Sequence, residues 1–251
     1  MFRFRDISLK AKILIITMLG IVALALIFSF LFTRSIGNQA TKSIIEKSHA
    51  VVFTAEAVRE NMADKLEQGV IQDFDTLVEE GDREKLLEAV PIITAINVAQ
   101  ENAERANYKF RVPKESPRNP DNTPTELEAR VLEELKETDA EEKIVYQEEQ
   151  IRYFRPIKLT EECMLCHGSP AGEPDPIGGT KEGWEVGEIH GAFEIISSLD
   201  AAQATQRSAA LNISLVSFAM LLVLGFLIWL SIKAVTKPLN EYIAKFTRVS
   251  E

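Results

Sequence analysis

Two long, uninterrupted apolar runs dominate the pattern of hydrophobic and polar positions along this chain. Residues 13–33 and 208–232 carry no charged side chain. Each run is long enough to cross the hydrocarbon core of a bilayer, which takes about 20 helical residues. The first run is followed by Arg34 rather than by a small-residue cleavage site, so we expect an uncleaved anchor and not a signal peptide. The pattern therefore predicts a chain that crosses a membrane twice.

Helical spacing of apolar residues continues beyond the first run. Residues 35–68 keep this spacing, so we expect the first span to extend outward as one helix. A second helical region covers residues 82–107. Pro91 should break or kink it, because proline removes a backbone donor and clashes with the preceding turn. Two helical segments are thus expected to open the part of the chain between the spans.

A third helix and four strands are expected in the remainder of this middle part. Thr123 suits the N-cap and Pro124 the first turn of a surface helix that runs to about Lys136. Stretches rich in β-branched and aromatic residues predict strands at residues 108–112, 144–147, 151–157 and 188–196, the middle two forming a hairpin. The fold class expected for the middle part is α+β, an antiparallel sheet with flanking helices, held between two transmembrane helices.

Charge then orients the chain in the membrane. Residues 1–12 and 233–251 together carry 8 basic and 3 acidic side chains, whereas the sequence between them has 20 basic and 35 acidic ones. Because basic residues stay on the cytoplasmic side, we expect both ends in the cytoplasm of a bacterial inner membrane, and residues 34–207 as a periplasmic domain. The net charge of −10 indicates a solvated acidic surface and no nucleic-acid partner.

One short motif in this middle part indicates a cofactor. Cys163, Cys166 and His167 have the spacing of covalent c-type haem attachment. Two thiols can form thioethers with the haem vinyl groups, and the adjacent imidazole can reach the iron as its proximal ligand. The motif falls in the predicted periplasmic part, on the oxidising side of the membrane. The sequence therefore predicts one covalently bound haem c.

Zinc binding and dithiol chemistry are the alternatives for the same residues. A four-cysteine zinc site is excluded because the chain has only two cysteines, and a mixed site would have to recruit the distant His190. A thioredoxin-like dithiol normally opens a helix, but the glycines and prolines of residues 168–179 disfavour one. We expect residues 168–183 to form a turn-rich surface loop that covers one edge of the haem, although a featureless linker fits the same composition.

The distal iron ligand remains open. Met62 is a candidate because it lies outside the spans and outside the attachment motif, although a helical methionine also suits simple core packing. His49, His190 and a water or vacant position are the alternatives.

At the level of layout, the chain resembles the periplasmic haem-c sensor domains with a PAS-like fold found in bacterial chemoreceptors and sensor kinases. The resemblance rests on the anchor, on residues 49–62 and 90–104, on the haem motif, and on the strand at residues 191–193. It implies a PAS-like sheet, His167 as the proximal ligand, Met62 as the distal ligand, a homodimer, and a role in signal transduction such as chemotaxis.

The segment after the second span is similar to the first helix of a HAMP linker. Residues 234–251 fit a short amphipathic helix that follows a break at Pro238, a pattern that a plain juxtamembrane helix shares. Because the sequence ends at Glu251, we expect a cytoplasmic signalling module either in cis, in a longer product, or in trans.

Together these features predict a membrane-anchored haem sensor that couples redox state or a small gaseous ligand to transmembrane signalling. A membrane-anchored monohaem cytochrome, passing electrons to a redox partner, is the alternative. No group of residues near the motif suggests substrate chemistry, so we do not expect an enzyme.

Overall fold

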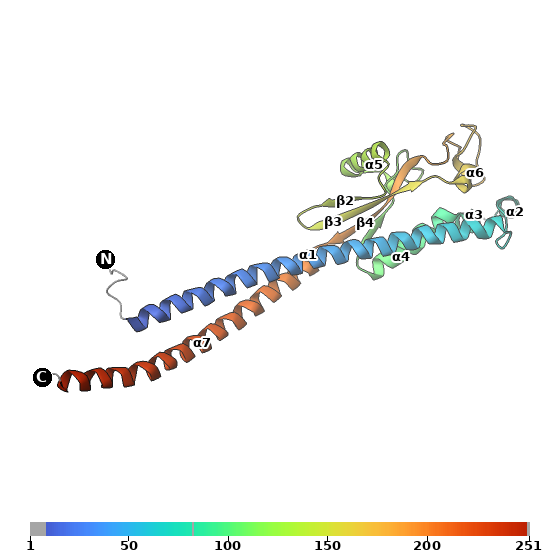
Figure 1. Ribbon diagram of the computed structural model, residues 1–251. Helices are drawn as coiled ribbons and strands as arrows, with labels where there is room; N and C mark the ends of the chain where they lie inside the picture. Colours follow the sequence, from blue (N-terminus) through green and yellow to red (C-terminus); the bar gives the residue numbers. More distant parts are fainter. Residues whose placement is uncertain (1–8, 82, 250–251) are drawn as a thin grey trace. The chain divides into compact units, whose positions relative to one another are not determined.

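The computed structural model describes residues 9–81 and 83–249 (Figure 1). The chain divides into two units. The first unit holds the two ends of the chain, up to Ala40 and from Ala201 onward, and the second covers Thr41–Asp200. The second unit thus begins and ends a few residues inside the predicted domain of residues 34–207.

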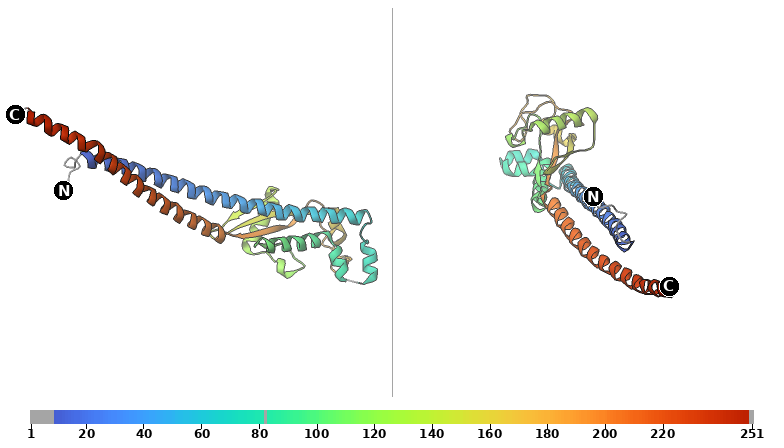
Figure 2. Two further views of the ribbon diagram at one scale, coloured as in Figure 1. Left: turned by 90° about the horizontal axis from the view of Figure 1, so that it is seen from below. Right: turned by 90° about the vertical axis from the view of Figure 1, so that its left-hand side faces the viewer.

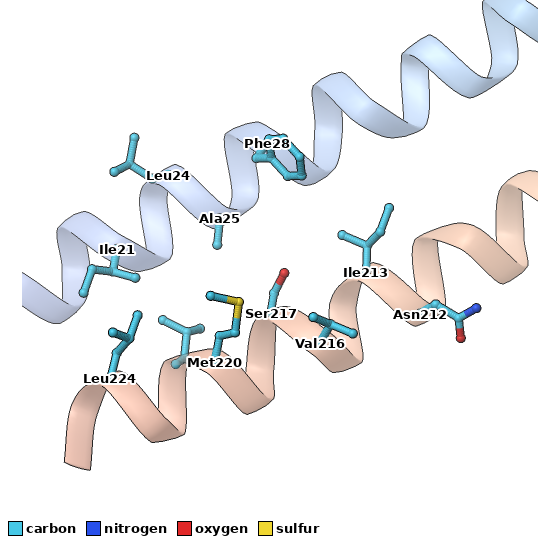
Figure 3. Close-up of a pocket in the computed structure, with 11 residues that line it drawn as sticks. Ile21, Leu24, Ala25, Phe28, Asn212, Ile213, Val216, Ser217, Met220 and Leu224 are labelled. Atoms are coloured by element: carbon cyan, nitrogen blue, oxygen red, sulfur yellow. The ribbon is translucent and has the colours of Figure 1, made fainter. Parts of the chain in front are cut away.

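The first unit consists of the apolar parts of two long helices. Helix α1 (Leu9–Glu67) begins in the first unit and its sequence continues into the second, and α7 (Asp200–Val249) begins where the second unit ends in sequence. Both are long and apolar enough to cross a membrane, as the sequence predicted. Figure 3 shows the groove between them, which is lined almost entirely by carbon atoms. Its labelled side chains include Ile21, Ala25 and Phe28 from α1, and Ser217, Met220 and Leu224 from α7.

The prediction that the helix breaks at Pro238 is wrong. Helix α7 continues through Pro238 to Val249. A proline inside a helix removes one hydrogen bond and costs about 3 kcal/mol, which a long helix can absorb by bending locally. The predicted N-terminal segment 1–12 and linker segment 233–251 include residues 1–8 and 250–251, which lie outside the described residues.

A four-stranded antiparallel sheet forms the centre of the second unit, and the expected α+β class is confirmed (Figure 1). Its strands are β1 (Lys109–Arg111), β2 (Lys143–Tyr146), β3 (Gln150–Lys158) and β4 (Ile189–Ser198), in the order β1-β4-β3-β2. Strands β2 and β3 form the predicted hairpin. Strands β3 and β4 pair along their length although the haem motif lies between them in sequence.

Both faces of the sheet are covered by helices (Figure 2). On one face, Tyr153 and Phe193 pack against α1 and against the alanines of α4 (Pro91–Arg105). On the other face, Phe154 packs against Leu132 of α5 (Glu126–Thr138). Neighbouring residues of β3 serve opposite faces because side chains alternate along a strand.

The short helices differ in detail from the prediction. The break at Pro91 is confirmed, since α3 (Arg83–Ala89) ends before it and α4 begins on it. Helix α2 (Phe74–Glu80), between the Asp73 N-cap and Gly81, was not predicted. A helix of two turns shows too few periods to be recognised from spacing.

The N-cap predicted at Thr123 is wrong. Thr125 caps α5, and its hydroxyl accepts from the Glu128 N–H while the Glu128 carboxylate accepts from the Thr125 N–H. Thr123 instead ends the short 3₁₀ helix η2 (Pro120–Asn122). The reciprocal capping box satisfies two backbone donors, which explains why the helix begins two residues later than expected.

Candidate haem-binding site

The motif with the two cysteines lies in the connection from β3 to β4. It forms the short 3₁₀ helix η3 (Glu161–Cys163) and the single turn α6 (Met164–His167). Residues three and four apart in a helical turn share a face, so the turn brings Cys163, Cys166 and His167 together. The backbone N–H groups of Gly183 and Trp184 both donate to the His167 carbonyl, which ties the end of the turn to the following loop.

Both thiols are free and differ in environment. Cys163 is half-buried, and the N–H of Thr160 donates to its sulfur at 3.4 Å. Cys166 is buried, and burial, together with the nearby Asp175 carboxylate, raises the pKa of its thiol to about 11. The Cys166 side chain is therefore neutral at physiological pH, as a thioether would also be.

The imidazole of His167 is oriented by a carboxylate. Its Nδ1 lies 2.7 Å from Oε2 of Glu182. A carboxylate oxygen only accepts, so Nδ1 carries the proton and Nε2 keeps its lone pair. Burial lowers the pKa of His167, which favours the neutral imidazole that binds metals. A metal-binding histidine is commonly fixed in this way, so the residues present fit a haem iron held at Nε2.

A single guanidinium holds the surrounding loop. Arg118 donates from Nε and Nη2 to the two oxygens of Glu182, both at 2.9 Å, and from Nη1 to Asp175. Its Nη2 also donates to the carbonyl oxygens of Cys166 and Thr180, each at 2.9 Å. Burial alone would raise the pKa of Glu182, but hydrogen bonds from Arg118 and His167 outweigh it and leave the pKa below its ordinary value. Glu182 is therefore an anion at neutral pH.

Aromatic rings stack beside the motif. Trp184 stacks on two imidazoles, with its ring centroid 4.9 Å from that of His167 and 3.9 Å from that of His190. The ammonium group of Lys114 lies 4.6 Å from the Trp184 ring centroid. The mixed zinc site is disfavoured because, across residues 9–81 and 83–249, no group of three or more His, Cys, Asp and Glu side chains is arranged to hold a metal.

The candidates for a distal ligand lie in three different places. His190 stacks on Trp184, which in turn stacks on His167 of the motif. His49 lies instead beside the hairpin, with Nε2 2.7 Å from Oε2 of Glu142 and its ring edge-on to Tyr153. Met62 is half-buried on α1, one turn beyond Arg59, whose Nη1 donates to the carbonyl of Lys158 at the end of β3.

Sequence reasoning missed the polar residues of the site. Arg118 and Glu182 are 64 positions apart, and neither belongs to a motif of fixed spacing. Lys114, which forms an isolated bridge with Gly191, carries no local signal either. The loop of residues 168–183 is largely irregular, as predicted, with one isolated bridge between Pro174 and Thr180. Its Asp175 is nevertheless buried, so this loop is not a featureless linker.

Three comparisons place the fold. A search of curated proteins finds no match. The crystal structure of the cyanobacterial heme-protein Tll0287 is similar at 22% sequence identity and a TM-score of 0.50, covering 62% of this chain and 95% of that one. At this identity the likeness concerns the fold alone. The family model described as Tll0287-like matches residues 37–198, a range that includes the entire sheet and the cysteine motif. Because this match covers more than half of the chain, the protein belongs to the Tll0287-like family.

Proposed function

We propose that this protein is a membrane-anchored haem-c sensor. In this proposal one haem is joined to Cys163 and Cys166 by thioethers, and His167 binds its iron from the proximal side. The observation that carries the haem assignment is the pair His167 Nδ1–Glu182, which leaves Nε2 free on the same turn as the two thiols. The solved relative named as a heme-protein adds support. When bound, the haem would supply a one-electron couple and a site for a small ligand.

A short path connects the proposed site to the second span. His190, which stacks on Trp184 beside His167, belongs to β4. This strand ends at Ser198, and α7 begins at Asp200. The residue between them, Leu199, is held because its N–H donates to the carbonyl of Glu149 at 2.8 Å. A single residue therefore separates β4 from α7, and this short connection supports the signalling proposal.

Helix α1 provides the second connection. It carries Met62 and continues back to Leu9 as one element. We propose Met62 as the distal ligand, because Arg59, one turn earlier, contacts the end of the strand that leads into the motif. A thioether binds ferrous iron better than ferric iron, so reduction or a competing gaseous ligand would change the link between α1 and the haem.

Topology and partners are part of the same proposal. The basic ends and the acidic middle of the chain favour cytoplasmic termini and a periplasmic domain in a bacterial inner membrane. The protein would act as a homodimer that contacts a cytoplasmic signalling module, in cis or in trans.

Optical spectroscopy tests the haem assignment. The full chain, produced in a host that attaches haem c, should be coloured, and its pigment should resist extraction with acidified acetone. Ferric spectra and carbon monoxide binding should then be compared between the native protein, Met62→Ala and Met62→Leu. Leucine keeps the apolar volume but has no sulfur, so both variants should bind carbon monoxide more readily. A colourless native protein would refute the haem assignment, and unchanged spectra in both variants would refute Met62 as the ligand.

Electron transfer is the second candidate function. The observation that favours it is the exposure of Leu165 and Val186 near the motif, with the exposed carboxylates of Glu161 and Glu185 beside them. Apolar contact surrounded by negative charge suits docking of a basic electron-transfer protein. Spin labels at Ser35→Cys and Ser208→Cys, both exposed, distinguish the two functions. Their separation should change on haem reduction if the protein signals, and should stay constant if it only carries electrons.

A further inference from the structure

We propose that Glu182 and Arg118 form a pair with opposite effects on the electron affinity of the haem. Glu182 would act on the iron through His167, and Arg118 would moderate Glu182. This inference rests on the proposed function, because it requires iron at Nε2 of His167. It concerns how the protein sets the redox potential of the site.

Glu182 is placed to strengthen His167 as a ligand. The Nδ1–H of His167 donates to its Oε2 at 2.7 Å, a length typical of a charge-assisted hydrogen bond. A carboxylate in this position draws the proton toward itself and makes Nε2 a stronger donor. A stronger donor, with a negative charge close by, favours ferric over ferrous iron. Glu182 should therefore lower the reduction potential.

Arg118 acts on the same carboxylate from the other side. Its Nε and Nη2 bind both oxygens of Glu182 in a two-pronged arrangement, so Oε2 accepts from Arg118 and from His167 at once. A guanidinium paired in this way withdraws charge from the carboxylate and competes for its lone pairs. Arg118 should therefore weaken the effect of Glu182 and raise the reduction potential.

The remaining bonds of Arg118 fix this geometry. Its other contacts are Asp175 and the carbonyl oxygens of Cys166 and Thr180, one on the motif turn and the others on the loop. Asp175 is itself held, since its Oδ1 accepts from the N–H groups of Ile177 and Gly179. The guanidinium is therefore held beside Glu182 by contacts with both the motif turn and the loop.

Two substitutions with opposite expected effects test the pair. In Glu182→Gln the amide oxygen can still accept from Nδ1–H, but the negative charge is gone, so the haem should reduce more readily. In Arg118→Gln the carboxylate acts on His167 without its counter-charge, so the haem should reduce less readily. Loss of the hydrogen-bond partner of a metal-binding histidine changes metal affinity or activity by about 10- to 100-fold. We expect about a tenfold change in the ratio of oxidised to reduced haem, which equals about 59 mV for one electron.

The measurement is a mediated redox titration of the full-length protein in detergent, with covalent haem content determined first. Arg118→Lys keeps the charge but not the two-pronged contact and should fall between the native protein and Arg118→Gln. Arg130→Gln, which removes an exposed arginine on α5, is the matched control and should not shift the potential. In the Glu182→Gln background, Arg118→Gln should shift the reduction potential much less, because the carboxylate that Arg118 acts on is absent.

Each outcome decides the question. A native protein without covalent haem refutes the proposed function and this inference with it. If all variants contain haem, two results refute the pair while leaving haem binding intact. The first is that Glu182→Gln and Arg118→Gln shift the reduction potential in the same direction. The second is that both change the ratio of oxidised to reduced haem by less than twofold. If Arg118→Gln loses its haem, Glu182→Gln and Arg118→Lys still test the pair. A merely structural role of Glu182 predicts no rise in the reduction potential of Glu182→Gln.

Discussion

A buried carboxyl on the central strand β4 makes the stability of the second unit depend on pH. The Glu194 side chain is fully buried, and Arg152 donates to it from Nε. Glu128 of α5 lies against the same arginine. Replacing Glu194 by glutamine keeps the shape and the polar character of the side chain but removes its ability to bind and release a proton.

The sign of the effect follows from the two carboxyls. Burial, reinforced by the neighbouring Glu128, raises the pKa of Glu194 to about 8, against an ordinary value of 4.5. Between these values the folded protein holds a proton that the unfolded chain has released, so the free energy of unfolding falls as the pH rises, by at most about 1.4 kcal/mol per pH unit. Burial alone would raise the pKa of Glu128, but hydrogen bonds, chiefly with Glu194, Thr125 and Arg111, lower it. Its stabilising contribution is therefore already complete above pH 4.5 and stays constant in this window.

Urea unfolding of the full chain in detergent at pH 5.5, 6.5 and 7.5 measures this dependence. Fluorescence of Trp184 reports on the second unit once Trp229, in the apolar part of α7, is replaced by phenylalanine. We expect the unfolding free energy of the Glu194 protein to fall, relative to Glu194→Gln, by about 1 kcal/mol per pH unit. Glu134→Gln, on the exposed side of α5, is the control and should follow the native profile. Parallel profiles for the native protein and Glu194→Gln would show that the reasoning is wrong.

Three further predictions follow from features described above. Thr125→Ala should lower the free energy of unfolding by about 1 kcal/mol, whereas Thr123→Ala should cost less, and chemical denaturation would show whether the order is reversed. Leu132→Ala removes a fully buried side chain between α5 and the sheet and should cost about 2 to 5 kcal/mol in the same assay, so a loss below 1 kcal/mol would contradict the packing. His167→Ala should keep covalent haem but change its Soret band through loss of the proximal imidazole, and an unchanged spectrum would argue against His167 as a ligand.

Much of the fold could be predicted because its signals are local. All four strands, the hairpin and the interruption at Pro91 follow from alternation and from proline chemistry. The start of α5 was misjudged because Thr123 and Thr125 are both good N-caps. The pair Thr125 and Glu128, spaced as a capping box, was the signal in the sequence that would have decided it.

The residues of the candidate site likewise differ in whether a local sequence signal reveals them. Cys163, Cys166 and His167 are recognisable because the chemistry requires them to be adjacent. Arg118 and Glu182 meet only because the β3–β4 connection folds back across a segment far away in sequence, and no local pattern encodes that approach. The distal ligand stays a prediction for the same reason, since Met62 belongs to a helix remote from the motif in sequence.

The direct pairing of β3 with β4 has a consequence for how the proposed haem would be attached. At the base of the intervening segment, Leu159 N–H donates to the Glu188 carbonyl, and Gly187 N–H donates to the Leu159 carbonyl. The ends of the segment are therefore closed by the backbone itself, and the sheet is complete without any atom of the motif. In the proposed function, the pairing of β3 with β4 therefore does not depend on haem attachment. A change in the length of this segment should therefore leave the pairing of β3 with β4 intact.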